Sequence, residues 1–334
     1  MPEEVKKGES PVTTSTPKST EGGSVATDMT ESNKPSSGEY IICGQNKLTD
    51  FDLDVIIADI AKRSRNGRRL FVPIGTSQSG KSMFIASLLC YKGVGSCEIH
   101  ALSGDKRNKE IFDAITESVR KKGRTLSQTP EGMFTVIDVE MTVKKRGHAK
   151  VTFIDFAGED IERMLDKKAY DTEEESAKNQ MAATKKIMSI LKTACTKYRA
   201  FFPLLSPIDV SFTTERKEES DYDMSQADAM AAFLNQLWDK EQNTYKKSMF
   251  AVVVTKWDIL PVRRSPEWYL KTYRKQLYNS CRGKDITFFP YSAGDVQGNV
   301  ITLLRETNAQ VLWFRVFKWI TGKHVLPWWK RLFS

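Results

Sequence analysis

The sequence predicts an α/β fold in which a mixed, mostly parallel sheet is flanked by helices. From residue 40 onward, short runs of β-branched and aromatic residues alternate with longer segments of helical periodicity, a pattern typical of strands joined by crossover helices. The chain has 334 residues, of which 40% are hydrophobic and 28% charged, so we expect an ordinary globular core in one or two domains.

The first 39 residues differ in composition from the rest of the chain. They are rich in Ser, Thr, Pro, Glu, Gly and Lys and contain no aromatic residue, so they cannot bury enough apolar surface to offset the entropy of ordering. We expect residues 1–39 to form a disordered tail, and a spacer is its simplest role. With seven acidic and four basic residues, the tail carries a net charge of −3 and leaves +12 on the remainder.

Six short apolar or β-branched runs are candidate strands: Arg69–Ile74, Phe134–Val143, Val151–Asp155, the run near Ala200–Leu205, Phe250–Thr255 and Ile286–Tyr291. The second and third runs are joined by Lys144–Lys150, a short polar turn that contains Gly147. The turn predicts one antiparallel hairpin in an otherwise parallel sheet.

Seven segments have helical periodicity: Phe51–Ser64, Lys81–Tyr91, Asp105–Lys121, Glu173–Tyr198, Ser225–Glu241, Pro266–Cys281 and Asn308–Thr321. In Glu173–Tyr198, apolar residues recur at three- and four-residue steps after an acidic start, which favours a helix N-terminus there. An amphipathic helix covering the sheet is the simplest interpretation of this segment.

Composition also bears on compartment and partners. The sequence has no run of eighteen apolar residues and no apolar N-terminal stretch, so it predicts neither a membrane span nor a secretory signal, and we expect a cytoplasmic protein. Five scattered cysteines without a C-x-x-C pair and three separated histidines predict reduced thiols rather than a zinc site. A net charge of +9 permits an anionic partner, but we predict no specific nucleic acid.

The segment Gly75–Ser82, GTSQSGKS, matches the pattern G-x-x-x-x-G-K-[ST] between an apolar strand and a helical run. Its glycines let backbone N–H groups point inward, and the following helix N-terminus adds partial positive charge, so a nest for phosphate forms. Lys81 is placed to reach the β- and γ-phosphates, and Ser82 to give its hydroxyl to magnesium. The predicted nucleotide-binding residues are Gly75, Ser77, Gln78, Ser79, Gly80, Lys81, Ser82 and Met83.

A second acidic segment, Val151–Gly158, ends in DFAG and delivers a carboxylate to the same edge of the sheet. Asp155 can hold magnesium through water. Gly158 can present its backbone N–H to the γ-phosphate, because the absence of a side chain permits close approach. Alone the pattern is weak, but it gains weight beside the phosphate loop.

The strand that starts near Phe250 ends in TKWD, which bears on the choice of base. Asp258 can accept two hydrogen bonds from the ring N–H and amine of guanine, which adenine does not offer in that arrangement, and Lys256 can cover the ring with its alkyl stem. A surface turn with chance charges is the alternative. The predicted base-binding residues are Thr255, Lys256, Asp258, Ser292 and Ala293, the last two placing a backbone N–H near the guanine carbonyl.

In this order GTSQSGKS, DFAG, TKWD and YSA resemble the Ras-like, translation-factor-related class of P-loop GTPases, from about Arg69 to Thr321. The resemblance implies a sheet of about six strands, GTP or GDP bound with Mg²⁺, and two conformations of the switch loops. Thr255 stands where the class most often has Asn, and Gly294 where Lys usually follows S-A. The long spacing from Gly158 to Thr255 predicts helical insertions. The FAGED segment and the tryptophan-rich end are most similar to bacterial double-GTPases of conflict and defence loci.

The resemblance also implies a switch I threonine that contacts magnesium and the γ-phosphate. Thr129 is favoured over Thr125 and Thr135 because it lies in a polar loop just before a predicted strand, and Arg124 nearby is a candidate arginine finger. The predicted catalytic residues are Lys81, Thr129, Gly158 and Glu159, and the predicted magnesium ligands are Ser82, Thr129 and Asp155.

Glu159 stands where many Ras-like GTPases have the glutamine that orients the attacking water. Two interpretations remain open: its carboxylate orients water despite repelling the γ-phosphate, or it points away and helps Asp160 to start a helix. In either case we expect slow intrinsic hydrolysis that needs a partner.

The carboxyl end, Val311–Ile320 and His324–Ser334, holds four of the seven tryptophans beside lysines and arginines. We expect the first segment to be the last sheet-covering helix, with Trp313, Phe317 and Ile320 buried. Residues 324–334 are predicted to dock onto a protein partner or an anionic membrane, after a GTPase domain at 40–323.

Together these observations predict a GTP-binding regulatory switch that hydrolyses GTP slowly and with partner stimulation, in a bacterial regulatory or defence system. It is expected in the cytoplasm or peripherally at the inner face of the membrane. The alternative is a nucleotide-dependent scaffold with little hydrolysis.

Overall fold

The structure is a computed structural model that describes residues 42–93, 97–165, 175–208, 221–238, 248–260, 264–297 and 299–325. The predicted tail at 1–39 lies outside these ranges. So does most of the predicted docking segment, of which only His324 and Val325 are described.

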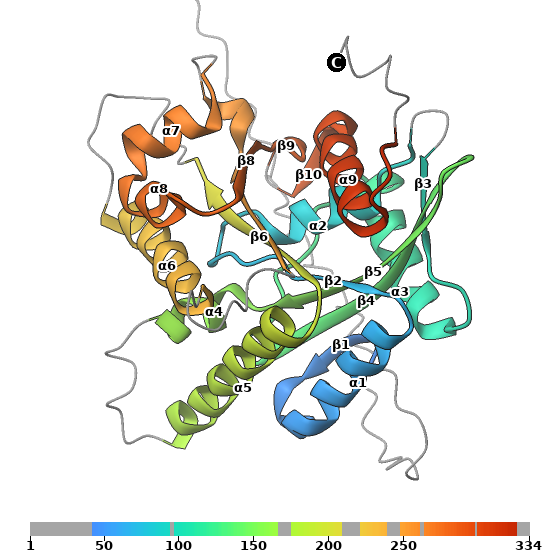
Figure 1. The fold of residues 1–334 in the computed structure, drawn as a ribbon, viewed down its shortest axis with the longest axis horizontal. Helices are drawn as coiled ribbons and strands as arrows, with labels where there is room; N and C mark the ends of the chain where they lie inside the picture. Colours follow the sequence, from blue (N-terminus) through green and yellow to red (C-terminus); the bar gives the residue numbers. More distant parts are fainter. Residues whose placement is uncertain are drawn as a thin grey trace, which may run out of the picture. The chain divides into compact units, whose positions relative to one another are not determined.

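The centre of the described chain is an eight-stranded mixed sheet in the order β1-β4-β5-β2-β6-β7-β8, with β3 also paired to β4 (Figure 1). Its strands are β1 (Gly44–Lys47), β2 (Arg69–Phe71), β3 (Cys97–Ala101), β4 (Met133–Val143), β5 (Gly147–Phe156), β6 (Ala200–Pro207), β7 (Met249–Thr255) and β8 (Ile286–Pro290). Strands β5, β2, β6, β7 and β8 are mutually parallel. The predicted mostly parallel sheet is therefore confirmed, although the predicted number of about six strands is too low.

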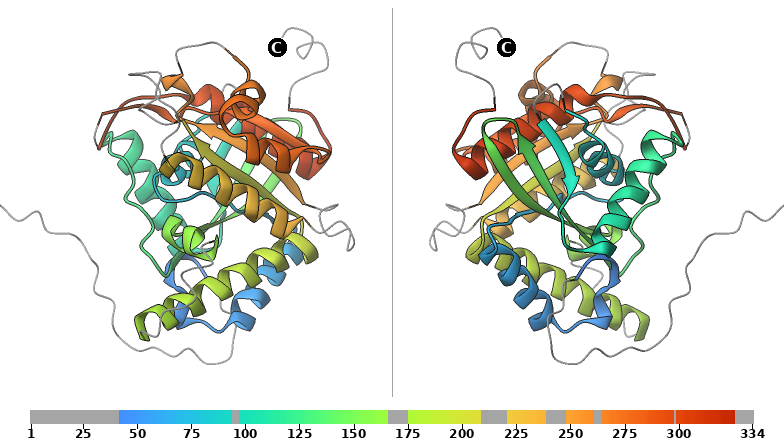
Figure 2. Two further views of the ribbon diagram at one scale, coloured as in Figure 1. Left: turned by 90° about the vertical axis from the view of Figure 1, so that its left-hand side faces the viewer. Right: turned by 90° about the vertical axis from the view of Figure 1, so that its right-hand side faces the viewer.

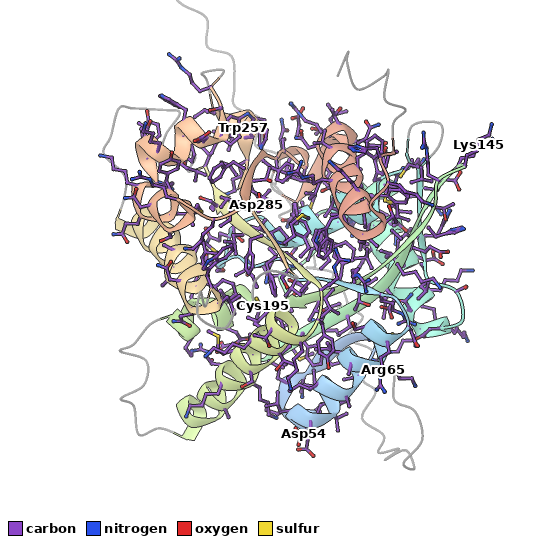
Figure 3. All side chains as sticks on the ribbon, in the orientation of Figure 1. Asp54, Arg65, Lys145, Cys195, Trp257 and Asp285 are labelled. Atoms are coloured by element: carbon purple, nitrogen blue, oxygen red, sulfur yellow. The ribbon has the colours of Figure 1, made fainter. Side chains whose placement is uncertain are left out.

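The predicted antiparallel hairpin is β4–β5, paired from Phe134 and Phe156 to Val143 and Gly147. Lys145 lies at its tip with a positive φ of 65°, and Figure 3 shows it at the end of the hairpin. The two unpredicted strands of this sheet, β1 and β3, pair with successive parts of β4 along the same edge. Both are short and alternate buried with exposed residues, so neither forms the apolar run expected of a buried strand.

The described helices are α1 (Leu53–Arg65), α2 (Lys81–Leu89), α3 (Lys106–Arg120), α4 (Gly158–Leu165), α5 (Glu175–Lys197), α6 (Asp221–Leu237), α7 (Pro266–Tyr273), α8 (Lys275–Cys281) and α9 (Glu306–Thr321). Two differences from the prediction stand out. The segment Pro266–Cys281 is two helices, because Arg274 leaves helical geometry with φ −130° and ψ 51°. Helix α4 was not among the seven predicted segments, although a helix start at Asp160 was one of the two interpretations of Glu159. With α5, β6 and α6 it lies in the long interval between DFAG and TKWD.

Helices cover both faces of the sheet. Figures 1 and 2 show α1 and α5 side by side on one face, where α6 also contributes to the apolar core, and α2 and α9 on the other. Trp313 and Phe317 of α9 are fully buried as predicted, and the Trp313 indole Nε1 donates to the Leu88 carbonyl at 3.0 Å. Ile320 is only half-buried. All five cysteines are buried and unbridged, including Cys195 in the last turn of α5 (Figure 3).

A buried ion network ties α1 to the sheet. Arg63 is 2% exposed and donates to Asp59 at 2.8 Å, to Asp138 on β4 and to the Ile42 carbonyl. Although burial opposes the charge, Asp138 and Asp59 raise the pKa of Arg63, so it stays a cation. Asp138 also accepts from Arg68 at 2.7 Å. Because each buried charge depends on the others, removal of one partner leaves an uncompensated charge in the core.

None of the helices in the described ranges is both long enough and apolar enough to cross a membrane.

Candidate nucleotide-binding site

The four predicted segments meet at one edge of the sheet. The phosphate loop follows β2, DFAG ends β5 and starts α4, TKWD follows β7, and YSA follows β8. Because these strands are parallel, their carboxyl ends lie at the same edge, where open α/β sheets bind ligands.

The phosphate loop has the backbone that the glycine pattern predicts. Gln78 and Gly80 have positive φ of 61° and 84°, and α2 begins at Lys81. A Cβ at Gly75 would lie 2.3 Å from the Ser79 hydroxyl, so only glycine fits there. Lys81 is 6% exposed, and its Nζ lies 3.1 Å from Asp155 Oδ1 without the alignment of a hydrogen bond. The buried ammonium thus keeps hydrogen-bonding capacity for a phosphate oxygen.

A cavity of about 160 Å³ opens beside this loop. Its wall consists of the loop, of Leu126, Gln128 and Thr129, and of Gly158 and Glu159 at the start of α4. The volume and the facing donors suit phosphate groups.

Thr129, a predicted magnesium ligand, lies beside Asp155 at the phosphate cavity. Its Oγ1 donates to Asp155 Oδ2 at 2.6 Å, and it lines the phosphate cavity together with Ser82. Hydroxyl and carboxylate oxygens are the hard ligands that Mg²⁺ prefers, so Ser82, Thr129 and Asp155 fit the ion. Thr125 lies elsewhere, with its N–H donated to the Asn299 carbonyl at 3.0 Å, and Thr135 lines a neighbouring cavity.

A second cavity, of about 350 Å³, shares Gly80 and Met83 with the phosphate cavity. Its lining includes Thr255, Lys256, Asp258 and Ala293, as the sequence predicts for the base. Ser292 does not line it: this residue is buried, and its carbonyl accepts from Asn308 at 3.1 Å.

Hydrogen bonds connect the base segment, residues 255–258, to its surroundings. Thr255 Oγ1 donates to the Ser79 carbonyl at 2.7 Å, which links TKWD to the phosphate loop. Lys256 has a positive φ of 56°, an unusual conformation for a non-glycine residue of the kind that clusters at functional sites. Tyr291, whose pKa burial raises, shares a 2.6 Å hydrogen bond with Ser87 of α2. Trp257, labelled in Figure 3, donates its N–H to the Tyr291 carbonyl at 3.1 Å.

An unpredicted hairpin, β9 (Gly294–Gln297) and β10 (Val300–Leu304), forms one wall of the base cavity through Val296. It explains why Lys is missing after S-A, because a Cβ at Gly294 would lie 2.0 Å from the Leu303 carbonyl oxygen. The hairpin also reaches the loop before Thr129, since Ile301 N–H donates to the Gly123 carbonyl at 2.7 Å.

Arg124, the candidate arginine finger, is exposed and does not line the phosphate cavity. Its backbone instead forms an isolated bridge with Val300 of β10.

Helix α4 packs directly on the phosphate loop. A Cβ at Gly158 would lie 2.5 Å from the Ser77 nitrogen, which leaves room for glycine only. Ser77 Oγ donates to Glu159 Oε1 at 2.9 Å, and Ser77 N–H donates to Glu162 Oε1 at 2.8 Å. Glu159 therefore faces the cavity rather than pointing away from it, although it also lies in the first turn of α4.

Helix α4 is also joined to the segment that follows Thr129. The fully buried Asp160 accepts from Gly132 N–H at 2.9 Å, and Arg163 pairs with Glu131. Burial raises the pKa of Asp160, against the Gly132 hydrogen bond. Glu162 is not among the predicted site residues, although its position three residues after Glu159 places both on one helix face.

Strand order, phosphate loop and base segment together define a P-loop GTPase of the double-GTPase type. The chain belongs to the Double-GTPase 1 family, whose model matches residues 72–288. No curated protein matches it in sequence.

Among solved structures, the chain is similar to the signal recognition particle receptor SRb-GTP/SRX complex from Chaetomium thermophilum, with 13% identity over 70% of this chain and 92% of that chain and a TM-score of 0.35. It is also similar to Toc33 from Arabidopsis thaliana in complex with Mg²⁺ and GMPPNP, with 13% identity over 83% of this chain and 96% of that chain and a TM-score of 0.38. At these TM-scores neither likeness bears on what this chain binds.

Proposed function

We propose that this protein is a guanine-nucleotide switch that binds GTP with Mg²⁺ and hydrolyses it to GDP and phosphate. The observation that carries the proposal is that a phosphate cavity and a base cavity meet at Gly80 and Met83. Membership of the Double-GTPase 1 family supports the same activity.

At the phosphate end, Lys81 and the N–H groups of the loop would hold the β- and γ-phosphates. Ser82, Thr129 and Asp155 would hold Mg²⁺, which when bound neutralises charge on the phosphate oxygens. The contact between Thr129 and Asp155 supports this assignment, because it gathers the oxygen ligands at one point beside the cavity. Gly158 would offer its backbone N–H to the γ-phosphate, since its close packing on Ser77 places it at the cavity wall.

At the base end, Asp258 would select guanine by accepting from the ring N–H and the exocyclic amine. Lys256, Ala293 and Val296 line the same cavity and would enclose the ring. Thr255 would act on binding indirectly, by holding Ser79 and thus the loop in place.

The rate of hydrolysis depends on Glu159. We propose slow turnover that a protein partner stimulates, in a bacterial regulatory or defence system, because the Glu159 carboxylate accepts a hydrogen bond from Ser77 rather than lying free to orient water. The same observation favours the second candidate, a nucleotide-dependent scaffold with little hydrolysis. Single-turnover measurements of GTP hydrolysis by wild type and by Glu159→Gln separate the slow GTPase from the scaffold. A scaffold would leave GTP intact in both proteins.

We also propose a cytoplasmic location and a protein effector. Residues 324–334, of which 326–334 lie outside the described ranges, are proposed to dock on that partner or on an anionic membrane surface, because they combine tryptophans with Lys330 and Arg331. Liposome co-sedimentation and partner pull-down of a chain ending at Lys323 would test this, and undiminished association in both assays would contradict it.

Phosphate release with GTP and with ATP tests the main proposal. Wild type should release phosphate from GTP, and Lys81→Ala should abolish release because it removes the buried ammonium at the loop. Equal release from both nucleotides, or release that survives Lys81→Ala, would overturn the proposed function.

A further inference from the structure

Ser77 stands between the phosphate cavity and α4, and two carboxylates hold it. Its backbone N–H donates to Glu162 Oε1 at 2.8 Å, and its hydroxyl donates to Glu159 Oε1 at 2.9 Å. Backbone N–H groups of such a loop are the donors that bind anions. Here one of them binds a carboxylate of the chain itself.

The contacts around α4 fix this arrangement. Gly158 packs against the backbone of Thr76 and Ser77, where a Cβ would come within 2.7 Å of the Thr76 carbonyl carbon. On the other side, Asp160 accepts from Gly132 N–H at 2.9 Å. These contacts hold the first turn of helix α4, which fixes Glu159 at the wall of the cavity and Glu162 on the Ser77 N–H.

Within the described ranges neither Glu159 nor Glu162 forms an ion pair, whereas Lys81 pairs with Asp155 and Arg163 with Glu131. Burial raises the pKa of Glu162, the Ser77 hydrogen bond lowers it, and the neighbouring Glu159 raises it further. The surroundings therefore disfavour additional negative charge at this wall.

A nucleoside triphosphate brings additional negative charge to this wall. In the proposed function the loop would bind the β-phosphate and the γ-phosphate would extend toward Gly158, whereas a diphosphate would not reach so far. We propose that Glu162 is a specificity-determining residue that lowers the affinity for nucleoside triphosphate relative to diphosphate, through the negative charge that it holds on the Ser77 N–H. The proposal rests on the proposed function. Glu162 does not line the cavity, so it acts without touching the nucleotide.

Titration with fluorescently labelled GDP and GMPPNP in the presence of Mg²⁺ tests this role. Glu162→Gln removes the charge but keeps a carbonyl oxygen that can accept from Ser77. It should raise the affinity for GMPPNP relative to GDP roughly fivefold, the scale of one partly exposed charge interaction. Glu98→Gln is the matched control: it makes the same change of charge on β3, at a side chain that is 66% exposed, and should leave the ratio unchanged.

Glu162→Ala separates charge from hydrogen bonding. If the charge sets the preference, Glu162→Ala and Glu162→Gln raise the ratio alike. A rise in Glu162→Ala alone would assign the effect to the lost hydrogen bond and overturn the proposal, as would a ratio for Glu162→Gln within twofold of wild type. Equal loss of both affinities would also overturn it, because it would mean a general role in holding the loop. If wild type binds neither GDP nor GMPPNP, the proposed function fails together with the role of Glu162. Failure of the proposed function is thereby distinguishable from failure of the role of Glu162 alone.

Discussion

Thr255 links the base segment to the phosphate loop through one hydrogen bond between buried groups. Its Oγ1 lies 2.7 Å from the Ser79 carbonyl oxygen, and the two residues are 4% and 1% exposed. Thr255→Val keeps the shape of the side chain and removes the donor. Loss of one partner from a buried pair costs about 1–3 kcal/mol of unfolding free energy. In a domain of this size each kcal/mol lowers Tm by roughly 2–4 °C.

The same variant should weaken nucleotide binding, because the loop would lose the contact that sets its position beside the base segment. We expect GDP affinity to fall about tenfold, equivalent to ~1.4 kcal/mol. Thermal melting and a fluorescence titration measure both effects. Thr272→Val is the matched control, since Thr272 is exposed on α7 and its hydroxyl donates to the Trp268 carbonyl of its own helix at 2.8 Å. The reasoning is refuted if Thr255→Val lowers Tm no further than Thr272→Val and leaves GDP affinity unchanged.

Asp138→Ala should lower the urea-unfolding free energy by about 3–5 kcal/mol, because Arg63 and Arg68 would lose the carboxylate that they share and Asp59 alone would balance the buried Arg63; a loss below ~1 kcal/mol would contradict this role of the network. Gly294→Ala should lower both Tm and guanine-nucleotide affinity, because its Cβ would meet the Leu303 carbonyl oxygen at 2.0 Å and its φ is 153°; unchanged affinity would separate the hairpin from the base cavity. Burial raises the pKa of Cys43, Cys97 and Cys281 to about 12 and of Cys90 and Cys195 to about 11. The native thiols should therefore react slowly with a thiolate-selective reagent at pH 8. The free energy of unfolding should be independent of thiol ionisation below pH 9.0 and should fall as the pH rises from there toward 12. Rapid modification of the native protein at pH 8 would contradict this.

The sequence predicts the features that depend on local pattern. Short motifs or periodicity predict the phosphate loop, the apolar strands before that loop and before TKWD, and the buried face of α9 at Trp313 and Phe317. The structure confirms where these elements lie. Thr129, which lies beside Asp155, is predicted as a site residue from the family resemblance and the polar character of its loop.

The features that the sequence does not predict depend on tertiary contacts. β1 consists of Gly-Gln-Asn-Lys and is a strand only because Met133–Val136 of β4 pair with it. Nothing local distinguishes Arg274, where α7 ends and α8 begins. The contact of Glu162 with Ser77 spans 85 residues, so it becomes visible only when α4 packs on the loop.

A comparison of the affinities for different nucleotide bases tests the nucleotide site most directly. Competition titrations with GDP, ADP and XDP should show that wild type strongly prefers GDP, because Asp258 is proposed to accept from guanine N–H groups that the other bases do not present in this arrangement. Asp258→Asn should transfer that preference to XDP, because the amide offers a donor where the carboxylate offered an acceptor. Equal affinity of wild type for GDP and ADP, or GDP affinity that is unchanged in Asp258→Asn, would contradict the assignment of this site to guanine nucleotides.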